Sequence, residues 1–314
     1  MNSTKPQIVE PIVPAHRIVT LRFWKAFWIT MRPYLLPVSG ITGLVGLSLL
    51  DLEVLSFKWM ATFIASLLSY GLGQALTDCT QIDTDRLSSP YRPLVRGTVT
   101  PRQVAAISLT LLCIGIAVLA TFNAYTILIA AAMVAGLATY TFFKRRWWGG
   151  PLWNSWIVAL LPLLTYLIGS RSTRPWSLPP ELLALMASTF FTYGVFVILG
   201  YFKDVSADRS AGYRTIVVRF GWHKAVYVDT VITLLGIGAS VTAILLALSG
   251  GTAAPGNALF PLAVVVWVLG SYLLILANFQ LLRIPDRDDK AYKAIGNVVR
   301  GFILLHGAEV IFFN

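Results

Sequence analysis

The chain has 314 residues, of which 56% are hydrophobic and 12% are charged, whereas about 25% of the residues in a soluble domain are charged. This composition, with a mean hydropathy of +0.71, excludes an ordinary soluble enzyme and a disordered chain. The net charge of +11 accompanies apolar segments instead of a polar basic face. We therefore expect membrane lipid, and no nucleic acid, as a partner.

Nine apolar segments of a length that crosses a bilayer follow one another along the chain. They cover residues 27–50, 59–77, 104–120, 126–143, 152–169, 182–201, 225–248, 259–282 and 295–313. Pro33 and Pro37 predict a broken or kinked entry to the first segment. The expected fold is an all-α membrane protein, a bundle of about nine transmembrane helices.

Two regions are expected along the chain. Residues 1–22 contain charged residues, three prolines and no apolar run of the kind that a cleaved signal needs, so we expect a cytoplasmic N-terminal tail. No long polar linker divides the remainder. Residues 23–314 are therefore predicted to form a single transmembrane domain.

The basic residues predict the orientation of this domain, because short cytoplasmic loops carry the excess of Lys and Arg. With nine spans and a cytoplasmic N-terminus, 22 of the 25 basic residues fall on the cytoplasmic side. Only Lys58, Arg171 and Arg174 fall on the other side. The C-terminus is then expected outside.

Five of the 14 acidic residues gather at the ends of the second and sixth segments, namely Asp78, Asp83, Asp85, Asp204 and Asp208. Carboxylates beside a membrane are costly unless they are paired or bind a metal. On a continuous helix, Asp78, Gln81 and Asp85 share one face, as do Asp204 and Asp208. Such an oxygen-rich face suits Mg²⁺, with phosphate oxygens and water completing the coordination. Asp83 is rotated away and is either a paired loop acid or a functional one.

The surroundings of the two acidic motifs also repeat. The first continues as Asp85-Arg86, Tyr91-Arg92 and Val95-Arg96-Gly97, and the second as Asp208-Arg209, Tyr213-Arg214, Val218-Arg219 and Gly221. An internal duplication would bring both motifs to one cytoplasmic mouth. Interleaved acids and bases suit a diphosphate held by metal and by Arg and Lys. The alternative is a pair of positive-inside loops with compensating acids.

Several motifs together resemble those of the UbiA superfamily of intramembrane prenyltransferases. Residues 77–85, TDCTQIDTD, with Pro90-Tyr-Arg-Pro93 and Gly97, resemble its first Asp-rich motif, and Lys203-Asp-Val-Ser-Ala-Asp208-Arg is similar to its second. Tyr140 to Lys144 looks like the Tyr-x-x-x-Lys segment of the family, and Arg32-Pro33 like its first-helix Arg-Pro. Order and spacing agree over most of the chain.

The resemblance implies a helix bundle whose central cavity opens toward lipid and binds an isoprenyl diphosphate, with its mouth on the cytoplasmic side. It implies Mg²⁺ as cofactor, Asp78, Asp85, Asp204 and Asp208 as catalytic metal ligands, and Gln81 as a further ligand. It implies that the diphosphate is bound by Lys144, Lys203, Arg92, Arg214, Tyr140 and Arg32. Aromatic faces would shield the allylic cation.

Two positions depart from the family pattern. Thr77 and Gln81 occupy positions where the family has Asn and Asp, so the first metal is expected to bind more weakly. An alternative register, Gln74-x-x-x-Asp78, would place Ile82 at the next ligand position, and we therefore keep the register that ends at Asp85.

The expected function is Mg²⁺-dependent transfer of an isoprenyl group to a hydrophobic acceptor, expected to be aromatic or quinone-like. The altered first motif leaves open a terpene cyclase, in which the cation is captured by the double bonds of the same molecule. A transporter or a non-catalytic scaffold is a third alternative, although the acids gather at one mouth and transporter sites lie near mid-membrane.

Overall fold

A computed structural model describes residues 15–50, 52–169, 178–250 and 258–313. These residues form helices joined by turns, and the described ranges contain no β-strand, so the expected all-α class is confirmed. The helices are α1 (Leu21–Thr30), η1 (Pro33–Leu35), α2 (Leu36–Leu47), α3 (Phe57–Asp78), α4 (Ile82–Ser88), α5 (Pro101–Phe122), α6 (Tyr125–Lys144), α7 (Gly149–Gly169), α8 (Pro180–Lys203), α9 (Val205–Ser210), α10 (Ile216–Phe220), α11 (Trp222–Gly250), α12 (Phe260–Leu282), η2 (Asp288–Lys290) and α13 (Tyr292–Phe312).

Seven described helices are long and apolar enough to cross a bilayer: α5, α6, α7, α8, α11, α12 and α13. They coincide with the third to ninth predicted segments, and their ends differ from the prediction by three residues or fewer. Residues 1–14 of the expected tail, and Arg171 and Arg174 of the expected outer loop, lie outside the described residues.

The break predicted at the proline pair within residues 27–50 is confirmed. Helix α1 ends at Thr30, and Arg32 turns the chain with a left-handed φ of 54°. The chain then restarts as η1 and α2, each with a proline in its first two positions. A proline can begin a helix but cannot donate the backbone hydrogen bond that continues one. The second predicted segment falls within α3.

Close helix contacts depend on small residues, as is common where helices pack within a membrane. A Cβ atom at Gly270 of α12 would lie 2.6 Å from the backbone nitrogen of Leu305 on α13. A Cβ atom at Gly46 of α2 would lie 2.1 Å from the backbone oxygen of Pro162 on α7. These glycines therefore bring α13 against α12, and α2 against α7.

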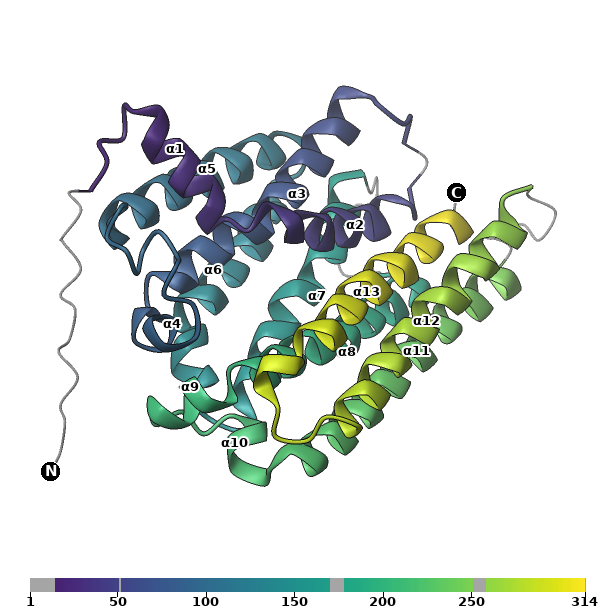
Figure 1. The fold of residues 1–314 in the computed structure, drawn as a ribbon. Helices are drawn as coiled ribbons and strands as arrows, with labels where there is room; N and C mark the ends of the chain where they lie inside the picture. Colours follow the sequence, from purple (N-terminus) through teal and green to yellow (C-terminus); the bar gives the residue numbers. More distant parts are fainter. Residues whose placement is uncertain (1–14, 51, 170–177, 251–257, 314) are drawn as a thin grey trace, which may run out of the picture.

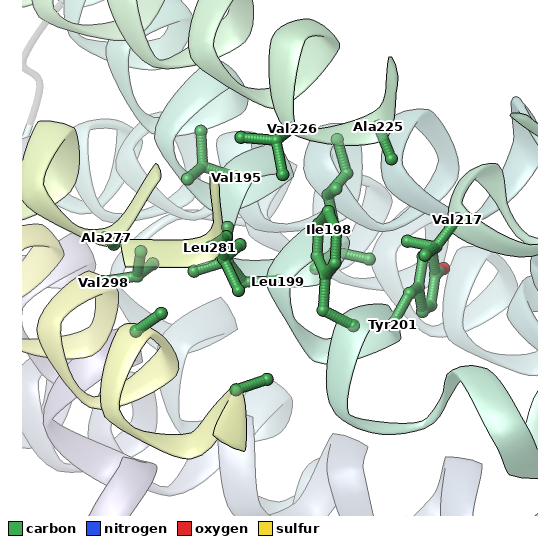
Figure 2. Close-up of a cluster of buried hydrophobic side chains, with 14 of the residues drawn as sticks. Val195, Ile198, Leu199, Tyr201, Val217, Ala225, Val226, Ala277, Leu281 and Val298 are labelled. Carbon is green, nitrogen blue, oxygen red and sulfur yellow. The ribbon is translucent and has the colours of Figure 1, made fainter. Parts of the chain in front are cut away.

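The largest apolar core surrounds α8. Figure 2 shows Ile198 and Leu199 of α8 among side chains from α10 to α13, including Val217, Val226 and Leu281. Their burial fixes the end of α8 that leads into the second acidic motif.

A buried polar cluster joins α8 to α13 beside this apolar core. Ser188 Oγ donates a hydrogen bond to Glu309 Oε1 at 2.8 Å, and Glu309 also pairs with His306. His306 Nε2 lies 3.0 Å from Thr192 Oγ1. All four side chains are fully buried, so each polar group depends on the others for hydrogen bonding.

The two acidic motifs lie at the same end of the bundle. The short helices α4 and α9 follow α3 and α8 and pack against each other, with α10 beside α9 (Figure 1). The arrangement brings together segments more than 100 residues apart in the sequence.

Candidate active site

A cavity of about 930 Å³ lies within the bundle and reaches the two acidic motifs. Nine of the eleven predicted site residues line it: Arg32, Asp78, Gln81, Asp85, Arg92, Tyr140, Lys144, Lys203 and Asp204. Asp208 is buried next to Lys144 without lining the cavity, and Arg214 is exposed. The predicted residues therefore gather at one end of a single cavity, with Arg214 as the exception.

The first motif does not lie on one continuous helix, which corrects the prediction. Helix α3 ends at Asp78, and Gln81 adopts a non-helical conformation (φ −120°, ψ 23°) before α4 begins. The backbone amides between the two helices form hydrogen bonds of short turns. One of them is donated by the Gln81 amide to the Asp78 carbonyl oxygen at 3.3 Å. Asp78, Gln81 and Asp85 still face the same cavity.

Asp78 is held by the protein on both carboxylate oxygens. Arg32 Nη2 lies 2.7 and 2.8 Å from the two oxygens, and Gln74 Nε2 donates to Oδ1 at 2.7 Å. Arg92 Nη1 is 3.6 Å from Oδ2. The left-handed turn at Arg32 thus places a guanidinium against the end of α3.

Asp85 forms a direct ion pair with Arg92. Burial and the neighbouring charge of Asp78 raise the pKa of Asp85, and Arg92 opposes this shift. Arg92 therefore holds the two carboxylates of the first motif side by side.

In the second motif, Asp204 and Asp208 differ sharply in their partners. Lys203 Nζ lies 2.6 Å from Asp204 Oδ1. Burial alone would raise the pKa of Asp204, but Lys203 and Lys144 outweigh it and lower the pKa. Within the described part of the chain, neither carboxylate oxygen of Asp208 has a hydrogen-bond partner. Burial raises the pKa of Asp208 to about 6, against the opposing effect of Lys144.

Lys144, at the end of α6, connects the two motifs. Its Nζ donates to Gln81 Oε1 at 2.9 Å and lies 3.8 Å from Asp208 Oδ1. It also faces the rings of Tyr201 and Tyr213, with centroids at 5.9 and 5.4 Å. A buried ammonium group is therefore placed between the two acidic motifs.

The sequence repeat is not matched by equivalent contacts. Arg92 pairs with Asp85, but its counterpart Arg214 is exposed, and the cation near Asp208 is Lys144 of α6. The backbone amide of Arg214 bonds to the carbonyl oxygen of Arg145, which fixes the loop and not the guanidinium. Asp208 thus takes its cation from another helix, whereas Asp204 pairs with Lys203 of its own motif.

Asp83 behaves as a paired loop acid. Its carboxylate lies 3.8 Å from Arg145 Nη2 and accepts a bond from the Tyr213 hydroxyl at 3.4 Å. It connects α4 to the loop after α9 outside the cavity.

The side-chain oxygens of the two acidic motifs fit a metal ion whose coordination shell is completed by substrate oxygens. Among the described residues there is no cluster of three or more His, Cys, Asp or Glu side chains that could enclose a metal. The carboxylates instead occur in two pairs, and the buried carboxylate of Asp208 lacks a hydrogen-bond donor. Mg²⁺ typically binds one or two carboxylates together with phosphate oxygens and water.

The rest of the cavity is mainly apolar. Its wall comes from α3, α5, α6, α7, α8 and α13. Ile64 and Ile114 line the cavity and are also 46% and 55% exposed. Exposed apolar side chains in this wall suit a cavity that opens to lipid.

Gln74, Asn154, Tyr292 and Arg300 are among the further polar residues that line the cavity. Gln74, which the alternative register of the motif would place at the Asn position, supports Asp78 directly. Arg300 is a cation inside the apolar segment 295–313, five residues from its start. From the sequence, its charge served only to predict the orientation of the chain in the membrane.

The model of the UbiA prenyltransferase family matches residues 39–298. The chain belongs to the UbiA prenyltransferase family. It is 32% identical over 168 residues to the digeranylgeranylglyceryl phosphate synthase of Halobacterium salinarum, covering 54% of this chain and 59% of that protein. The match thus spans less than two thirds of that relative. The enzyme of the same name from Thermococcus kodakarensis is 24% identical over 266 residues, covering 84% of this chain and 90% of that one.

Solved structures agree on the fold. A structure described as digeranylgeranylglyceryl phosphate synthase has a TM-score of 0.64 at 19% identity and covers 92% of this chain and 98% of its own. A UbiA homologue from Archaeoglobus fulgidus bound to DMAPP and Mg²⁺ has a TM-score of 0.62 at 16% identity, with 91% and 99% covered. This UbiA member is therefore an integral membrane protein with the family fold.

Proposed function

We propose that this UbiA member transfers an isoprenyl group from an isoprenyl diphosphate to a lipid-soluble acceptor within the membrane, with Mg²⁺ as cofactor. The observation that carries the proposal is the arrangement at one end of the apolar cavity. There, two carboxylate pairs stand beside Arg32, Arg92, Lys144 and Lys203. This arrangement suits a diphosphate head, and the apolar wall suits an isoprenyl tail.

The proposed metal ligands are Asp78, Gln81, Asp85, Asp204 and Asp208. Bound Mg²⁺ would act as a Lewis acid toward the charge that develops on the leaving diphosphate. Lys144 and Lys203 would face the same anion, and Arg32 and Arg92 would keep the first carboxylate pair oriented. Tyr140, whose hydroxyl lies 3.4 Å from that of Tyr201, would complete the wall beside the diphosphate.

The proposed reaction breaks the bond between C1 of the donor and its diphosphate oxygen, and the electron pair leaves with the diphosphate. The acceptor atom forms the new bond to C1 and gives its proton to the departing diphosphate. Tyr70, Tyr193 and Phe196 line the cavity and present aromatic surface to the positive allylic carbon.

We also propose nine spans with a cytoplasmic N-terminus and a cytoplasmic mouth. In this topology the broken segment from α1 to α2 is the first span and α3 is the second. Lys58 lies in the first turn of α3, at the end opposite Asp78. This position supports placing Lys58 on the outer side of the membrane. Labelling with a membrane-impermeant thiol reagent, after replacement of Cys79 and Cys113, should modify Ser210→Cys from the cytoplasmic side and Lys58→Cys from the other.

The names of the curated relatives suggest a geranylgeranyl donor and an acceptor of the glyceryl phosphate class. We propose these substrates as the first pair. The aromatic or quinone-like acceptor expected from the sequence is the second class to be compared with them.

The decisive experiment incubates the purified full-length protein in nanodiscs with Mg²⁺ and geranylgeranyl diphosphate, with and without geranylgeranylglyceryl phosphate. We expect a prenylated acceptor and stoichiometric diphosphate, both measured by mass spectrometry. A cyclised hydrocarbon formed from the donor alone would establish the terpene cyclase instead. The enzyme proposal would be rejected if diphosphate were released neither with geranylgeranylglyceryl phosphate nor with an aromatic or quinone-like acceptor.

A further inference from the structure

One face of α13 forms part of the cavity wall. The lining residues are Tyr292, Ile295, Gly296, Val299, Arg300 and Ile303, and their alternating spacing of three and one places them on a single helical face. Arg300 is the only cation among these six residues. It lies eight residues after the start of α13, about 12 Å along the helix axis.

Arg300 differs from the other cations of the cavity in its partners. Arg32, Arg92, Lys144 and Lys203 each face an aspartate. Within the described ranges, Arg300 forms no ion pair with a carboxylate. An Arg on a membrane-spanning helix is costly and marks a functional site when it faces a cavity.

The guanidinium of Arg300 bends back toward the mouth of the cavity. Its Nη1 lies 3.9 Å from the position that a Cβ atom would occupy at Gly296, one turn earlier on α13. Side chains on a helix tilt toward its N-terminus, which here is the end near the acidic motifs.

We propose that Arg300 binds the anionic headgroup of the acceptor, a phosphate monoester on a lipid. The inference rests on the proposed function, in which the diphosphate of the donor is held by the metal together with Lys144 and Lys203, while Arg32 and Arg92 orient the first carboxylate pair. Arg300 lies on a different wall, and its planar guanidinium can bind a phosphate through two parallel hydrogen bonds. The cavity therefore has two anion sites, one for each substrate.

The test compares Arg300→Gln with the wild type and with Lys293→Gln. Lys293 is an exposed cation on α13 that does not line the cavity. Initial rates are measured with geranylgeranyl diphosphate as donor and with geranylgeranylglyceryl phosphate or its dephosphorylated form, geranylgeranylglycerol, as acceptor. We expect Arg300→Gln to raise the KM for the phosphorylated acceptor by about 10- to 100-fold, the effect of one charge-assisted contact.

Other readouts separate this role from a structural one. The KM for the donor and the rate with the dephosphorylated acceptor should stay within about twofold of wild type, the range expected when no charge-assisted contact is lost. Arg300→Lys should recover part of the affinity for the phosphorylated acceptor, because it keeps the charge and loses the planar fork.

Three outcomes would overturn the inference. These are a raised KM for the donor, an equal loss with both acceptors, and a loss that follows the anionic lipid content of the nanodisc instead of the acceptor phosphate. If the wild type turns over no donor, the proposed function fails. Equilibrium binding of the glyceryl phosphate probe to wild type and Arg300→Gln still tests the anion site in that case, and equal affinities would reject it.

Discussion

Lys144 donates a hydrogen bond of 2.9 Å to the amide oxygen of Gln81, at a position where the family pattern has an aspartate. The pair joins the first acidic motif to the end of α6, and the same ammonium group lies 3.8 Å from Asp208. A neutral amide in this position removes one negative charge from the donor groups available to Mg²⁺.

Gln81→Asp should therefore lower the Mg²⁺ concentration needed for half-maximal activity by severalfold. The substitution adds an anionic oxygen beside a buried cation, and hard cations prefer carboxylate ligands. Activity is measured across a Mg²⁺ titration at fixed donor, with Gln81→Asn as the neutral control. An unchanged or higher Mg²⁺ requirement would show that Gln81 stands outside the metal coordination.

Asp208→Asn should reduce turnover of the donor by about 100- to 1,000-fold, because it removes a carboxylate that would hold the Mg²⁺ facing the leaving group, and loss of one preorganised electrostatic contribution has an effect of this size. Asp83→Asn is the matched control, because Asp83 is half-exposed and pairs with Arg145 outside the cavity. Diphosphate release is the measurement. Equal effects of the two substitutions would contradict the assignment of Asp208 to the site.

Arg92→Ala and Arg214→Ala should differ although the two positions correspond in the sequence repeat. Arg92→Ala leaves the buried Asp85 without its partner, and we expect a loss of about 100-fold or more in kcat/KM. Arg214→Ala should change it by less than about threefold, because the side chain is exposed. Comparable losses at both positions would favour equivalent roles for the two loops.

Removal of the divalent metal should abolish turnover. Treatment with EDTA leaves the carboxylates of both motifs without the cation that links them to the diphosphate, and added Mg²⁺ should restore activity. The measurement is diphosphate release before and after restoration. Turnover that persists in the chelated protein would count against the proposed use of these aspartates.

Glu309→Ala should lower the stability of the protein without changing the metal requirement. The substitution leaves Ser188 and His306 buried without their partner, and each such group costs about 1 to 3 kcal/mol. Thermal unfolding in a fixed detergent measures the effect, with Ser188→Ala as the milder variant because Glu309 then keeps His306. An unchanged melting temperature would show that the cluster does not stabilise the α8–α13 contact.

Composition and apolar periodicity predicted much of the fold, because a bilayer imposes a segment length that can be counted along the sequence. Seven predicted segments match candidate spans within three residues at each end. The positions of Asp78, Asp85, Asp204 and Arg32 on one cavity also follow the prediction from the motifs.

The corrections arise where the backbone leaves a regular helix or where partners come from distant segments. Helical spacing placed Gln81 on the helix of Asp78, but the chain turns between them. The motifs placed Arg214 among the residues that bind the diphosphate, but its side chain is exposed, and the cation that tertiary packing brings beside Asp208 is Lys144 of α6. The spacing of residues along one segment does not indicate which other helix packs against that segment.

The apolar side chains of Ile64 and Ile114 line the cavity and remain exposed, which suits an entrance from the lipid on this side. Substrates that enter by this route are already dissolved in the bilayer and need no passage through water. The relevant concentration is then the number of substrate molecules per lipid, so dilution of the membrane with inert lipid should slow the enzyme, whereas dilution of the aqueous phase should not.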